Sequence, residues 1–587
     1  MNFPTISYCP DLFNYRRRMT QEVTIGRLKM GGVNPVRLQS MTNTSTLDTE
    51  GSIEQSIRII EAGGELVRLT AQGVREAENL QNIRLGLIER GYRQPLSADI
   101  HFNPAAAEVA AQYVEKVRIN PGNFVDSART FRQLEYDDES YALEIDKIRA
   151  RLLPLLEICR RHHTALRLGV NHGSLSDRIM SRYGDSPAGM VESCMEFLRI
   201  CREQHFGNVV ISIKASNTVV MVQTVRLMVA TMIEEGMSFP LHLGVTEAGD
   251  AEAGRIKSAV GIGALLADGI GDTIRVSLSE DPEKEIPVAD KLLKHVVGCA
   301  CHLPIRAKVN ASFNPYIYQR RVTLKAGSVG NGQLPVVIGS GVDFGEMKPD
   351  FIKNQIALFT APQLQAAMVS PTSVKFVQLT YRDLTDTVID QLKSSENVVV
   401  VLSSDHANPV GEMRAFFHTL LNHGCQVPVV LHCHYSEADT ESFQVAAAAD
   451  LGVLFIDGFG DGIWLENNEL SASVVVSTAF GILQASRVRT TSTEFISCPG
   501  CGRTLFDLQT TIAKVKAATK HLPGLKIGIM GCIVNGPGEM ADADYGYVGA
   551  GKGKISLYRR KECVEKNISE EEAVDKLLAL INQFEKK

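Results

Sequence analysis

Short apolar runs rich in β-branched residues alternate with segments of helical apolar spacing from residue 35 onward. The runs have the length of strands, and the segments between them, such as 104–114 and 254–268, have the length of helices. Eight runs lie between residues 35 and 277, at 35–41, 65–70, 96–102, 115–120, 165–171, 209–216, 241–246 and 273–277. Eight consecutive β/α units predict an α/β fold that begins with an N-terminal (β/α)8 TIM barrel.

The C-terminal ends of barrel strands form the face that carries the active site, and in this chain these ends are polar. Five of the eight ends contribute a cation, namely Arg68, Arg118, Arg167, Lys214 and Arg275. The ends also carry Gln39, Asn43, Asp99, His101, Asn120, Asn171, Thr246, Glu247 and Ser277. A single arginine beside a strand usually pairs with a neighbouring carboxylate. Five cations at one mouth, in a chain of net charge −6, instead predict a bound polyanion, and a small diphosphate is the simplest candidate.

Three residues of this mouth have alternative interpretations. Lys214, which ends the sixth strand, could form a Schiff base with a carbonyl substrate, although the four arginines around it favour phosphate binding. His101 lies two residues after Asp99 and on the same side of the strand, either as a donor to a substrate oxygen or as a histidine satisfied within the barrel rim. Glu247 is either an acid/base group or a carboxylate that balances the cations.

The last hundred residues contain a cysteine pattern typical of a metal site. Cys498 and Cys501 stand three residues apart, and Cys532 follows in the glycine-rich sequence 531–539. Two thiols at this spacing can bind one centre, and the glycines let the backbone approach it. A fourth ligand must come from elsewhere, and Glu539 is the nearest side chain that supplies a carboxylate. An iron–sulfur cluster, a structural zinc site and a redox dithiol all remain compatible with these cysteines.

Length and composition limit the number of domains, the cellular compartment and the kinds of partner expected for this chain. A chain of 587 residues is too long for one core, so two to four domains are expected. A hydrophobic content of 44%, without a run of about twenty apolar residues or a signal-peptide pattern, predicts a soluble cytoplasmic protein with no membrane partner. The twelve cysteines are too scattered for a disulfide framework. The acidic balance argues against nucleic acid, and the basic sequence 14–18 is expected on the solvated surface.

A second β/α pattern occupies residues 300–490, with strand-like runs at 336–340, 376–380, 398–403, 428–432 and 453–457. It repeats part of the first pattern, because the sequence Asp-Gly-Ile-Gly-Asp at 268–272 recurs as Asp-Gly-Phe-Gly-Asp at 457–461. Upstream of each copy stands a Glu-Ala pair, at 247–248 and 437–438. These matches predict an inserted, barrel-like second domain that arose by duplication of half or all of the first barrel.

The second copy has lost the cations of the first. Aligning the glycine motif places Trp464 and Glu466 where the first copy has Arg275 and Ser277, so we expect a structural role for the insert. The sequence His-Cys-His at 432–434 does not predict a second metal site, because alternation along a strand directs His and Cys to opposite faces. After the insert, a helix at 505–520, a strand at 525–530 and a closing helix at 570–584 predict a small α/β domain around the cysteines.

Taken together, these motifs resemble the 4-hydroxy-3-methylbut-2-en-1-yl diphosphate synthase family of the methylerythritol phosphate route to isoprenoids. The resemblance rests on seven stretches in family order, at 36–44, 98–102, 117–123, 167–171, 245–249, 498–501 and 531–539. In shorter members of that family the barrel passes directly to the cluster domain, so this chain is similar to the long, three-domain form. The expected domains are a substrate-binding barrel at 1–298, a structural insert at 299–490 and a cluster domain at 491–587.

The resemblance implies a [4Fe–4S] cluster on Cys498, Cys501, Cys532 and Glu539. It implies the two-electron reduction of 2-C-methyl-D-erythritol 2,4-cyclodiphosphate to (E)-4-hydroxy-3-methylbut-2-enyl diphosphate, with a ferredoxin or flavodoxin as donor. The five cations, together with Asn171, Ser277 and Asn535, would bind the substrate, and Glu247 and His101 would manage protons. A homodimer is the expected assembly, with the site closed within one chain or across two. The alternative is a zinc-stabilised barrel lyase that uses Lys214 as a Schiff-base amine.

Overall fold

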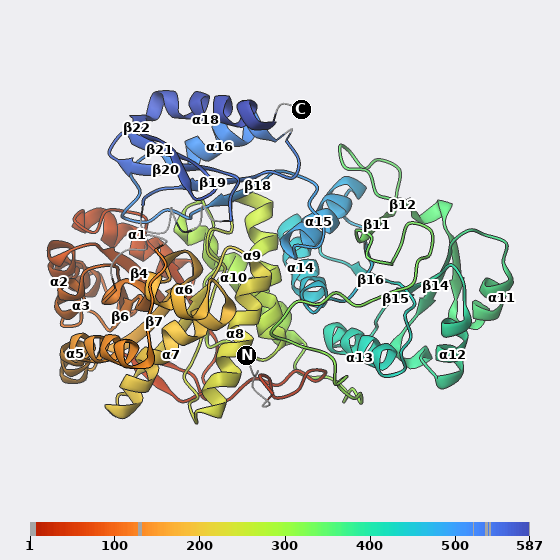
Figure 1. Cartoon of the computed structure of the whole chain (residues 1–587), viewed down its shortest axis with the longest axis horizontal. Coiled ribbons are helices and arrows are strands. Elements are labelled where there is room, and N and C mark those ends of the chain that lie inside the picture. Colours follow the sequence, from red (N-terminus) through yellow and green to blue (C-terminus); the bar gives the residue numbers. More distant parts are fainter. Residues whose placement is uncertain (1–6, 127–131, 521, 534–537, 539–541, 586–587) are drawn as a thin grey trace.

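The computed structural model describes residues 7–126, 132–520, 522–533, 538 and 542–585, and in these residues it comprises three large sheets with their helices and one two-stranded sheet. In Figure 1 the barrel lies at the left, the C-terminal α/β region lies above it, and the insert extends to the right. Asn535 and Glu539 lie outside the described residues. None of the helices in the described part of the chain is long and apolar enough to cross a membrane.

The first sheet is the predicted TIM barrel. Its parallel strands are β3 (Arg37–Met41), β4 (Leu66–Ala71), β5 (Leu96–Ile100), β6 (Lys116–Ile119), β7 (Ala165–Asn171), β8 (Val209–Lys214), β9 (His242–Leu243) and β10 (Thr273–Ile274). The pairing runs from β8 through β3 to β10 and β9, and a parallel bridge between Ile211 and Leu241 closes the barrel. Each strand coincides with one of the eight predicted runs, so the predicted fold class is confirmed.

Helices follow the strands, and several of them begin at a side chain that caps them. They are α1 (Thr49–Glu61), α2 (Val74–Glu89), α3 (Pro104–Ala110), α4 (Pro121–Phe124), α5 (Asp138–His162), α6 (Asp177–Tyr183), α7 (Pro187–Glu203), α8 (Thr218–Glu234), α9 (Ala251–Ala267) and α10 (Glu285–Gly298). Asn217, for example, accepts hydrogen bonds from the first amides of α8, and Asn103 with Pro104 begins α3. Because the caps of α3, α4 and α8 come directly after a strand, the chain leaves these strands through short turns.

An N-terminal hairpin closes the opposite end of the barrel. Its strands β1 (Val23–Ile25) and β2 (Leu28–Met30) pair antiparallel. Their apolar side chains pack on inward-facing residues of β4, β7 and β8 in one buried cluster, made of Val23, Ile25, Met30, Leu66, Ala165 and Val210. Solvent therefore reaches the barrel interior from the mouth and not from this end.

The insert is an open half-barrel whose strands are all parallel. Its strands are β11 (Val336–Gly339), β12 (Phe351–Ile352), β13 (Ala357–Thr360), β14 (Lys375–Leu379), β15 (Val398–Leu402), β16 (Val429–Tyr435) and β17 (Gly462–Asn467), in the order β12-β11-β17-β16-β15-β14-β13. Its helices are α11 (Leu364–Val369), α12 (Asp386–Ser394), α13 (Pro409–Asn422), α14 (Thr440–Ile456) and α15 (Ala472–Ala485). The pairing of β11 with β17 matches that of β3 with β10, which supports the predicted duplication.

One predicted strand of the insert is wrong. Residues 453–457 end helix α14, which is buried along most of its length between α9, α13 and α15. A helix buried on all sides carries no polar face, so its apolar run cannot be told from a strand by periodicity. The strand of this unit is β17, which begins after the glycine motif and was not predicted.

The basic sequence near the N-terminus is also not a solvated surface. Arg18 is buried, and Arg17 forms an ion pair with Asp272 at 2.9 Å. The insert repeats this contact, because Arg320 pairs with Asp461 at 3.3 Å. The duplication therefore extends to the segments that precede each copy, where Tyr-Arg-Arg-Arg-Met-Thr at 15–20 matches Tyr-Gln-Arg-Arg-Val-Thr at 318–323.

The barrel and the insert meet through a reciprocal contact between α9 and α14. Gly263 of α9 lies against Ala449 of α14, and Gly452 of α14 lies against Val260 of α9. These pairs are related by the repeat, since each glycine takes the same place in its own copy. Such reciprocity is the property of an isologous interface, here formed within one chain.

Beside this contact, four charged side chains form a closed ring. Arg226 contacts Asp268 at 2.8 Å and Asp457 at 2.7 Å, and Arg414 contacts the same two carboxylates at 2.8 and 2.9 Å. All four side chains are at most 1% exposed. Each aspartate ends the helix of its own copy and receives one arginine from each copy. The ring therefore ties the two halves together through buried ion pairs.

The third sheet is the C-terminal α/β region. It contains β18 (Glu494–Ser497), β19 (Lys526–Met530), β20 (Tyr545–Gly551), β21 (Lys554–Arg559) and β22 (Glu562–Ser569), in that order, with helices α16 (Leu508–Thr519) and α18 (Glu570–Glu585). The two predicted helices and the predicted strand are confirmed, whereas the remaining strands were not predicted. Figure 1 shows this sheet directly above the barrel mouth.

We expect Asp457→Ala to lower the free energy of unfolding by about 3–5 kcal/mol, because it leaves two arginines with one buried carboxylate. Urea denaturation followed by circular dichroism measures this change. Asp146→Ala, which removes an exposed surface partner of Arg149, is the matched control and should cost less than about 1 kcal/mol. Equal losses for the two variants would show that the ring does not join the domains.

Candidate functional site

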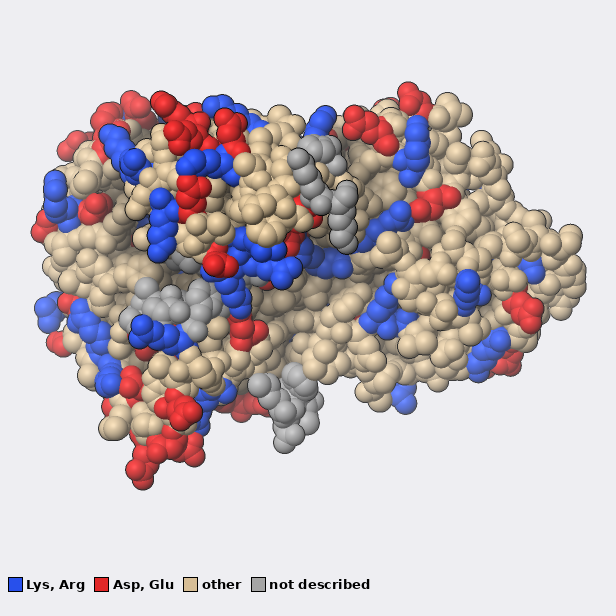
Figure 2. Space-filling model, turned by 45° about the horizontal axis from the view of Figure 1, so that its top comes forward, with Lys and Arg blue, Asp and Glu red and all other residues tan. Residues whose placement is uncertain are grey.

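One cavity lies between the barrel mouth and the C-terminal region, and residues of both line it. From the predicted site it gathers Arg68, His101, Arg118, Arg167, Asn171, Lys214, Glu247, Arg275, Ser277, Cys498, Cys501 and Cys532. On the face seen in Figure 2, Lys and Arg side chains gather in the central hollow of the molecule. Residues more than four hundred positions apart are therefore brought to one place within a single chain.

The five predicted cations differ in their partners. Arg118 donates to Asp99 at 2.8 Å, and Arg275 pairs with both oxygens of Glu285 at 2.9 Å. Among the described residues, Arg68, Arg167 and Lys214 form no ion pair with a carboxylate: Arg167 donates to Ser212 at 2.9 Å, and Arg68 contacts the sulfur of Met41. Asp99 and Glu285 pair with only two of these five cations, so the mouth keeps a positive excess that suits an anionic ligand.

Burial and mutual repulsion act on the unpaired cations. Burial lowers the pKa of Lys214 well below its usual value, and Arg68, Arg167 and Arg275 lower it further. Burial and the neighbouring cations likewise lower the pKa of Arg167. An anion bound among these side chains would stabilise their charged forms and reverse these shifts.

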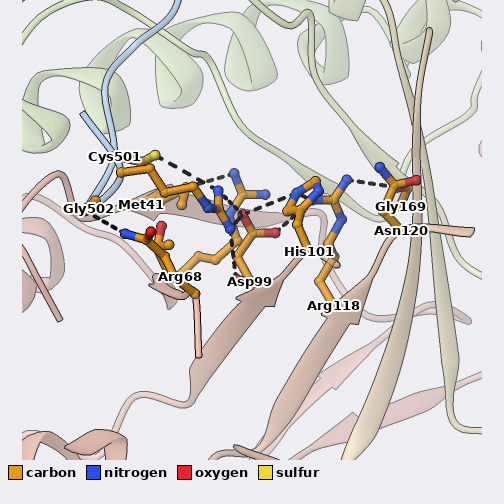
Figure 3. A network of polar contacts seen from close by, with 12 residues as sticks. Met41, Arg68, Asp99, His101, Arg118, Asn120, Gly169, Cys501 and Gly502 are labelled. Atoms are coloured by element: carbon orange, nitrogen blue, oxygen red, sulfur yellow. Dashed lines mark hydrogen bonds and ion pairs between the residues drawn. The ribbon is translucent and has the colours of Figure 1, made fainter. Parts of the chain in front are cut away.

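Asp99 is the carboxylate at the centre of the mouth (Figure 3). Burial alone would raise its pKa, but Arg118, Arg68 and Arg503 outweigh burial and hold the pKa well below the usual range. The carboxylate therefore stays ionised and orients the guanidinium groups around it. Glycine at position 169 makes this possible, because a Cβ there would lie 2.3 Å from Nε of Arg118.

His101 belongs to the same network. Its Nε2 is in hydrogen-bond contact with Arg118, and its Nδ1 lies 3.1 Å from the side-chain amide of Asn123. Burial, then Arg118 and Arg503, lower its pKa well below the usual value, so the imidazole is neutral. A neutral ring can orient Arg118 and can also exchange a proton with a ligand, and its predicted proton role remains a prediction.

Glu247 is buried and lies in the left-handed region of the backbone, with φ of 48°. A non-glycine residue in this conformation is strained, and such strain collects at functional sites. Its carboxylate is close enough to the thiol of Cys498 to help raise the pKa of that thiol. Glu247 therefore stands between the cations of the mouth and the cysteines.

A second polar layer lies beneath the arginines. Lys116 is fully buried inside the barrel, and its amine donates to Oε1 of Gln39 at 3.1 Å. Burial, Arg167 and Arg68 lower its pKa well below the usual value. The barrel interior is thus polar under the site, where most TIM barrels are packed with branched apolar side chains.

The three cysteines surround one end of the cavity. Cys498 accepts a hydrogen bond from the backbone N–H of Gly531 at 3.2 Å, and the Arg503 guanidinium lies 3.9 Å from the sulfur of Cys501. Burial, Cys532, Glu247 and Cys501 together raise the pKa of Cys498, while the Gly531 hydrogen bond opposes the rise. Three cysteine sulfurs at one cavity are soft donors of the kind that an iron–sulfur cluster requires. As they stand, the described residues contain no group of three donors that could hold a metal ion, and the predicted ligand Glu539 lies outside them.

Several contacts hold the cysteine loop on the barrel. Oγ of Ser279 donates to the carbonyl of Cys498 at 2.9 Å, and Gln72 donates to the carbonyl of Gly502 at 3.1 Å. Gly538 approaches the barrel most closely, because a Cβ there would lie 1.6 Å from the carbonyl oxygen of Gly173. The C-terminal region is therefore in direct contact with the turns that follow three barrel strands.

Sequence reasoning did not assign a role to Arg503, Met41 or Thr504, which also line the cavity. Arg503 lies two residues after Cys501, and this was the feature of the sequence that could have assigned it to the site. Asp99 was recognised as a strand end, but its partners could not be known before the fold was. The site is otherwise composed of the residues that the strand ends and the cysteine pattern predicted.

Two family models match the chain, one described as the GcpE TIM-barrel domain over residues 20–290 and one as the GcpE protein C-terminal domain over residues 494–583. A curated relative from Phocaeicola vulgatus is 59% identical over 97% of this chain and 98% of its own length. It is named 4-hydroxy-3-methylbut-2-en-1-yl diphosphate synthase (flavodoxin). The chain belongs to this enzyme family.

More distant members of the family also match along nearly the whole chain. The relative from Porphyromonas gingivalis is 50% identical over 98% of both chains. The relative from Chlorobaculum tepidum is 41% identical over 98% of this chain and 90% of its own length, and both carry the same name. Because these matches include the insert, the three-part organisation is shared with relatives. Membership does not favour the Schiff-base lyase.

Among solved structures, an N-acetylneuraminic acid synthetase from Leptospira borgpetersenii is 13% identical. It covers 49% of this chain and 94% of its own, with a TM-score of 0.32.

We expect Gly538→Ala to keep the C-terminal region from seating on the barrel, because the added methyl group overlaps the Gly173 backbone. Turnover should fall by at least about a hundredfold, since small misplacements of reacting groups have effects of this size. Small-angle scattering should show a larger radius of gyration, with an unchanged circular dichroism spectrum. Gly298→Ala, where a Cβ meets nothing, is the control. Normal scattering and turnover in Gly538→Ala would contradict the contact.

We expect Lys116→Met to stabilise the protein near neutral pH, because it removes a buried amine that folding keeps from being protonated. The pKa of Lys116 is lower in the folded protein than in the unfolded chain. Between these two pKa values only the unfolded chain is protonated at this amine, so the free energy of unfolding of the wild type rises with pH in that window. The variant should lose this rise. Thermal unfolding from pH 6 to pH 10, with the exposed Lys147→Met as control, measures it. Parallel profiles for wild type and Lys116→Met would contradict the prediction.

Proposed function

We propose that this chain converts 2-C-methyl-D-erythritol 2,4-cyclodiphosphate to (E)-4-hydroxy-3-methylbut-2-enyl diphosphate. The observation that carries the proposal is that five cations suited to a diphosphate and three cysteines suited to an iron–sulfur cluster line one cavity. The names of the relatives, which give this product and a flavodoxin, support it.

The reaction balances with two electrons and one proton. The ring C–O bond to phosphate and the neighbouring C–OH bond break, a C=C bond forms, and the hydroxyl leaves as water. The electrons come from a flavodoxin, as in the names of the relatives, or from a ferredoxin. The chain must therefore bind an anion tightly, admit electrons and supply a proton.

The barrel mouth would bind the substrate. Arg68, Arg167 and Lys214 would contact the diphosphate directly, because no carboxylate among the described residues competes for them. Arg118 and Arg275, already oriented by Asp99 and Glu285, would complete the clamp. The remaining predicted contacts are Asn171, Ser277 and, outside the described residues, Asn535.

Cys498, Cys501 and Cys532 would hold a [4Fe–4S] cluster, with Glu539 as the proposed fourth ligand. When bound, such a cluster supplies single electrons and a Lewis-acidic iron. Glu247, buried between the cations and Cys498, would hold the proton that the leaving hydroxyl takes up. His101, neutral and adjacent to Arg118, would orient that guanidinium and share the proton. The seated C-terminal region would exclude water from this space.

Each of the three domains would have one role in this reaction. Residues 1–298 would bind the substrate, residues 491–587 would hold the cluster, and residues 299–490 would serve as a structural support, since Trp464 and Glu466 stand there in place of Arg275 and Ser277. His432 pairs with Glu466 and His434 contacts Asn468, and the expectation that the insert has no second metal site stays a prediction. The expected homodimer stays a prediction, and the cavity supports a site that one chain can complete.

Metal and sulfide analysis tests the cluster first. Protein purified without oxygen should contain iron and acid-labile sulfide in near-stoichiometric amounts for one [4Fe–4S] cluster, with the matching visible and EPR spectra. Cys532→Ala should lose most of both, whereas Cys563→Ala, outside the cavity, should retain them. Zinc without sulfide in the wild type would contradict the reductive mechanism.

Turnover with a reduced flavodoxin tests the substrate site. Arg118→Ala should abolish product formation while the iron and sulfide content stays normal, because the clamp and the cysteines are separate groups of residues. Arg149→Ala, which changes a partly exposed arginine outside the cavity, should leave turnover unchanged. Borohydride trapping of substrate on Lys214 would instead point to the Schiff-base lyase.

A further inference from the structure

Asn123 contacts the ring nitrogen of His101 that does not contact Arg118. Its side-chain amide lies 3.1 Å from Nδ1 of the imidazole. On the other side of the ring, Nε2 is in hydrogen-bond contact with Nη1 of Arg118 (Figure 3). All three side chains are buried. The imidazole is therefore held between an amide and a guanidinium, and each contact limits where the ring can carry its proton.

These two contacts assign the proton of the ring to Nδ1. A guanidinium only donates hydrogen bonds, so Nε2 of His101 must accept from Arg118. A neutral imidazole carries one N–H, which must then be on Nδ1. Nδ1 therefore donates to Asn123, and the atom of Asn123 that can accept this hydrogen bond is its oxygen, Oδ1.

The amide of Asn123 can meet this requirement without moving its neighbours. The structure places its Nδ2 nearest to Nδ1 of His101 and leaves its Oδ1 without a hydrogen-bond partner among the described residues. With Nδ2 as the donor, both ring nitrogens would have to accept, which a neutral imidazole cannot do. A half-turn of the amide exchanges its two ends without changing its shape, and it gives Oδ1 the partner that it lacks.

The other protonation states of His101 are disfavoured. An N–H on Nε2 would point at Arg118, and Oδ2 of Asp99 lies 3.8 Å from Nε2, which is beyond hydrogen-bond distance. Burial, Arg118 and Arg503 lower the pKa of His101 well below its usual value, so the doubly protonated ring is disfavoured too. The neutral ring with its proton on Nδ1 is the state that fits its surroundings.

The turn that carries Asn123 is fixed at several points. The backbone N–H of Asn123 donates to the carbonyl of Asn120 at 3.0 Å. The side chain of Asn120 accepts from the N–H of Gly122 at 3.0 Å and donates to Oγ of Ser174 at 2.7 Å. A Cβ on Gly122 would lie 2.0 Å from the carbonyl oxygen of Ser174, so this turn packs closely on the next turn of the barrel. Asn123 is therefore presented to the ring in a defined position.

The orientation of Arg118 depends on the acceptor that His101 supplies. Nη1 of Arg118 donates to Oδ1 of Asp99 at 2.8 Å as well as to the ring, and Nη2 donates to the carbonyl of Gly169 at 2.7 Å. Two of these three acceptors, the imidazole and the carbonyl, are neutral. They orient the guanidinium without cancelling its charge, which leaves that charge available to an anion.

We propose that Asn123 is a positioning residue that holds His101 in its Nδ1–H tautomer and thereby keeps Nε2 as an acceptor for Arg118. His101 then takes part in proton transfer by accepting a proton at Nε2 and not by donating one from that atom. The sequence 118–123 thus contains both a clamp arginine and the residue that orients it through a neighbouring strand. The inference rests on the proposed function only in taking Arg118 to bind the diphosphate.

Nitrogen-15 NMR of the full chain, labelled on histidine and purified without oxygen, measures the tautomer directly. Protonated and unprotonated ring nitrogens differ strongly in their chemical shifts. The spectrum of His101→Gln identifies the signals of His101 among the fourteen histidines. In the wild type, Nδ1 should be protonated and Nε2 unprotonated from pH 6 to pH 9. A proton on Nε2 in the wild type would overturn the proposal.

Two variants separate acceptance from donation at position 123. Asn123→Asp can accept but cannot donate, so it should keep the proton on Nδ1, and its charge should raise the pKa of His101 above the wild-type value. Asn123→Leu has a similar shape and can do neither, so the proton should no longer be confined to Nδ1. If Asn123 instead donates to Nδ1, Asn123→Asp should move the proton from Nε2 to Nδ1. That change would overturn the proposal even if Asn123→Leu does not fold.

Calorimetry with inorganic pyrophosphate tests the consequence for Arg118. Asn123→Leu should bind pyrophosphate about ten- to a hundredfold more weakly than the wild type, which is the effect of losing one hydrogen bond to a charged group. Asn422→Leu changes an exposed asparagine of the insert that donates to the carbonyl of Lys308, and it should bind as the wild type does. A changed tautomer with unchanged affinity would show that the ring does not orient Arg118.

A structural role for Asn123 and a failure of the proposed function give different results. If Asn123→Leu weakens binding while the spectrum of His101 stays that of the wild type, Asn123 only supports the turn, and the proposal is overturned. If calorimetry detects no binding of pyrophosphate to the wild type, the anion site and the proposed function fail. The spectra of the wild type and Asn123→Asp still decide in that case whether Asn123 holds the tautomer.

Discussion

The repulsion among buried cations at the barrel mouth is the constraint on which the site depends. Five positive side chains share a space that contains few carboxylates, and burial makes each uncompensated charge costly. Asp99 and Glu285 reduce this cost by orienting Arg118 and Arg275, whereas Arg68, Arg167 and Lys214 are left to a ligand. A site built in this way is least stable when it is empty, so affinity for an anion follows from its construction.

Much of this organisation could be predicted from the sequence, because parallel strands impose a simple rule. Residues that end successive strands must meet at one mouth, so Arg167 and Lys214 could be assigned to the site without a structure. The cysteine spacing placed the proposed metal-binding loop for an equally local reason. Partners such as Glu285 for Arg275, or Asp99 for Arg503, depend on how loops far apart in the chain approach one another, and no local pattern reports that approach.

The two wrong predictions, a strand within α14 and a solvated surface at 14–18, have a common physical origin. Helix α14 was taken in part for a strand because it is buried on nearly every side and therefore lacks the polar face that reveals a helix. The basic sequence at 14–18 was placed on the surface because arginines are usually exposed, whereas Arg18 is buried and Arg17 is paired with Asp272. In both cases tertiary contacts changed the environment that the local sequence suggested: contacts with the other copy for α14, and contacts within the barrel for Arg17 and Arg18.

The reciprocal contact between α9 and α14 has a consequence for how this chain can change over generations. In a symmetric pair of separate subunits, every substitution at the interface appears twice and each half must tolerate it. Here the two halves are encoded separately, so Arg275 could remain in one copy while the other acquired Trp464. Covalent linkage also keeps the contact formed at any dilution, because the partner is always at a high local concentration. One half is thereby free to specialise in chemistry while the other holds it in place.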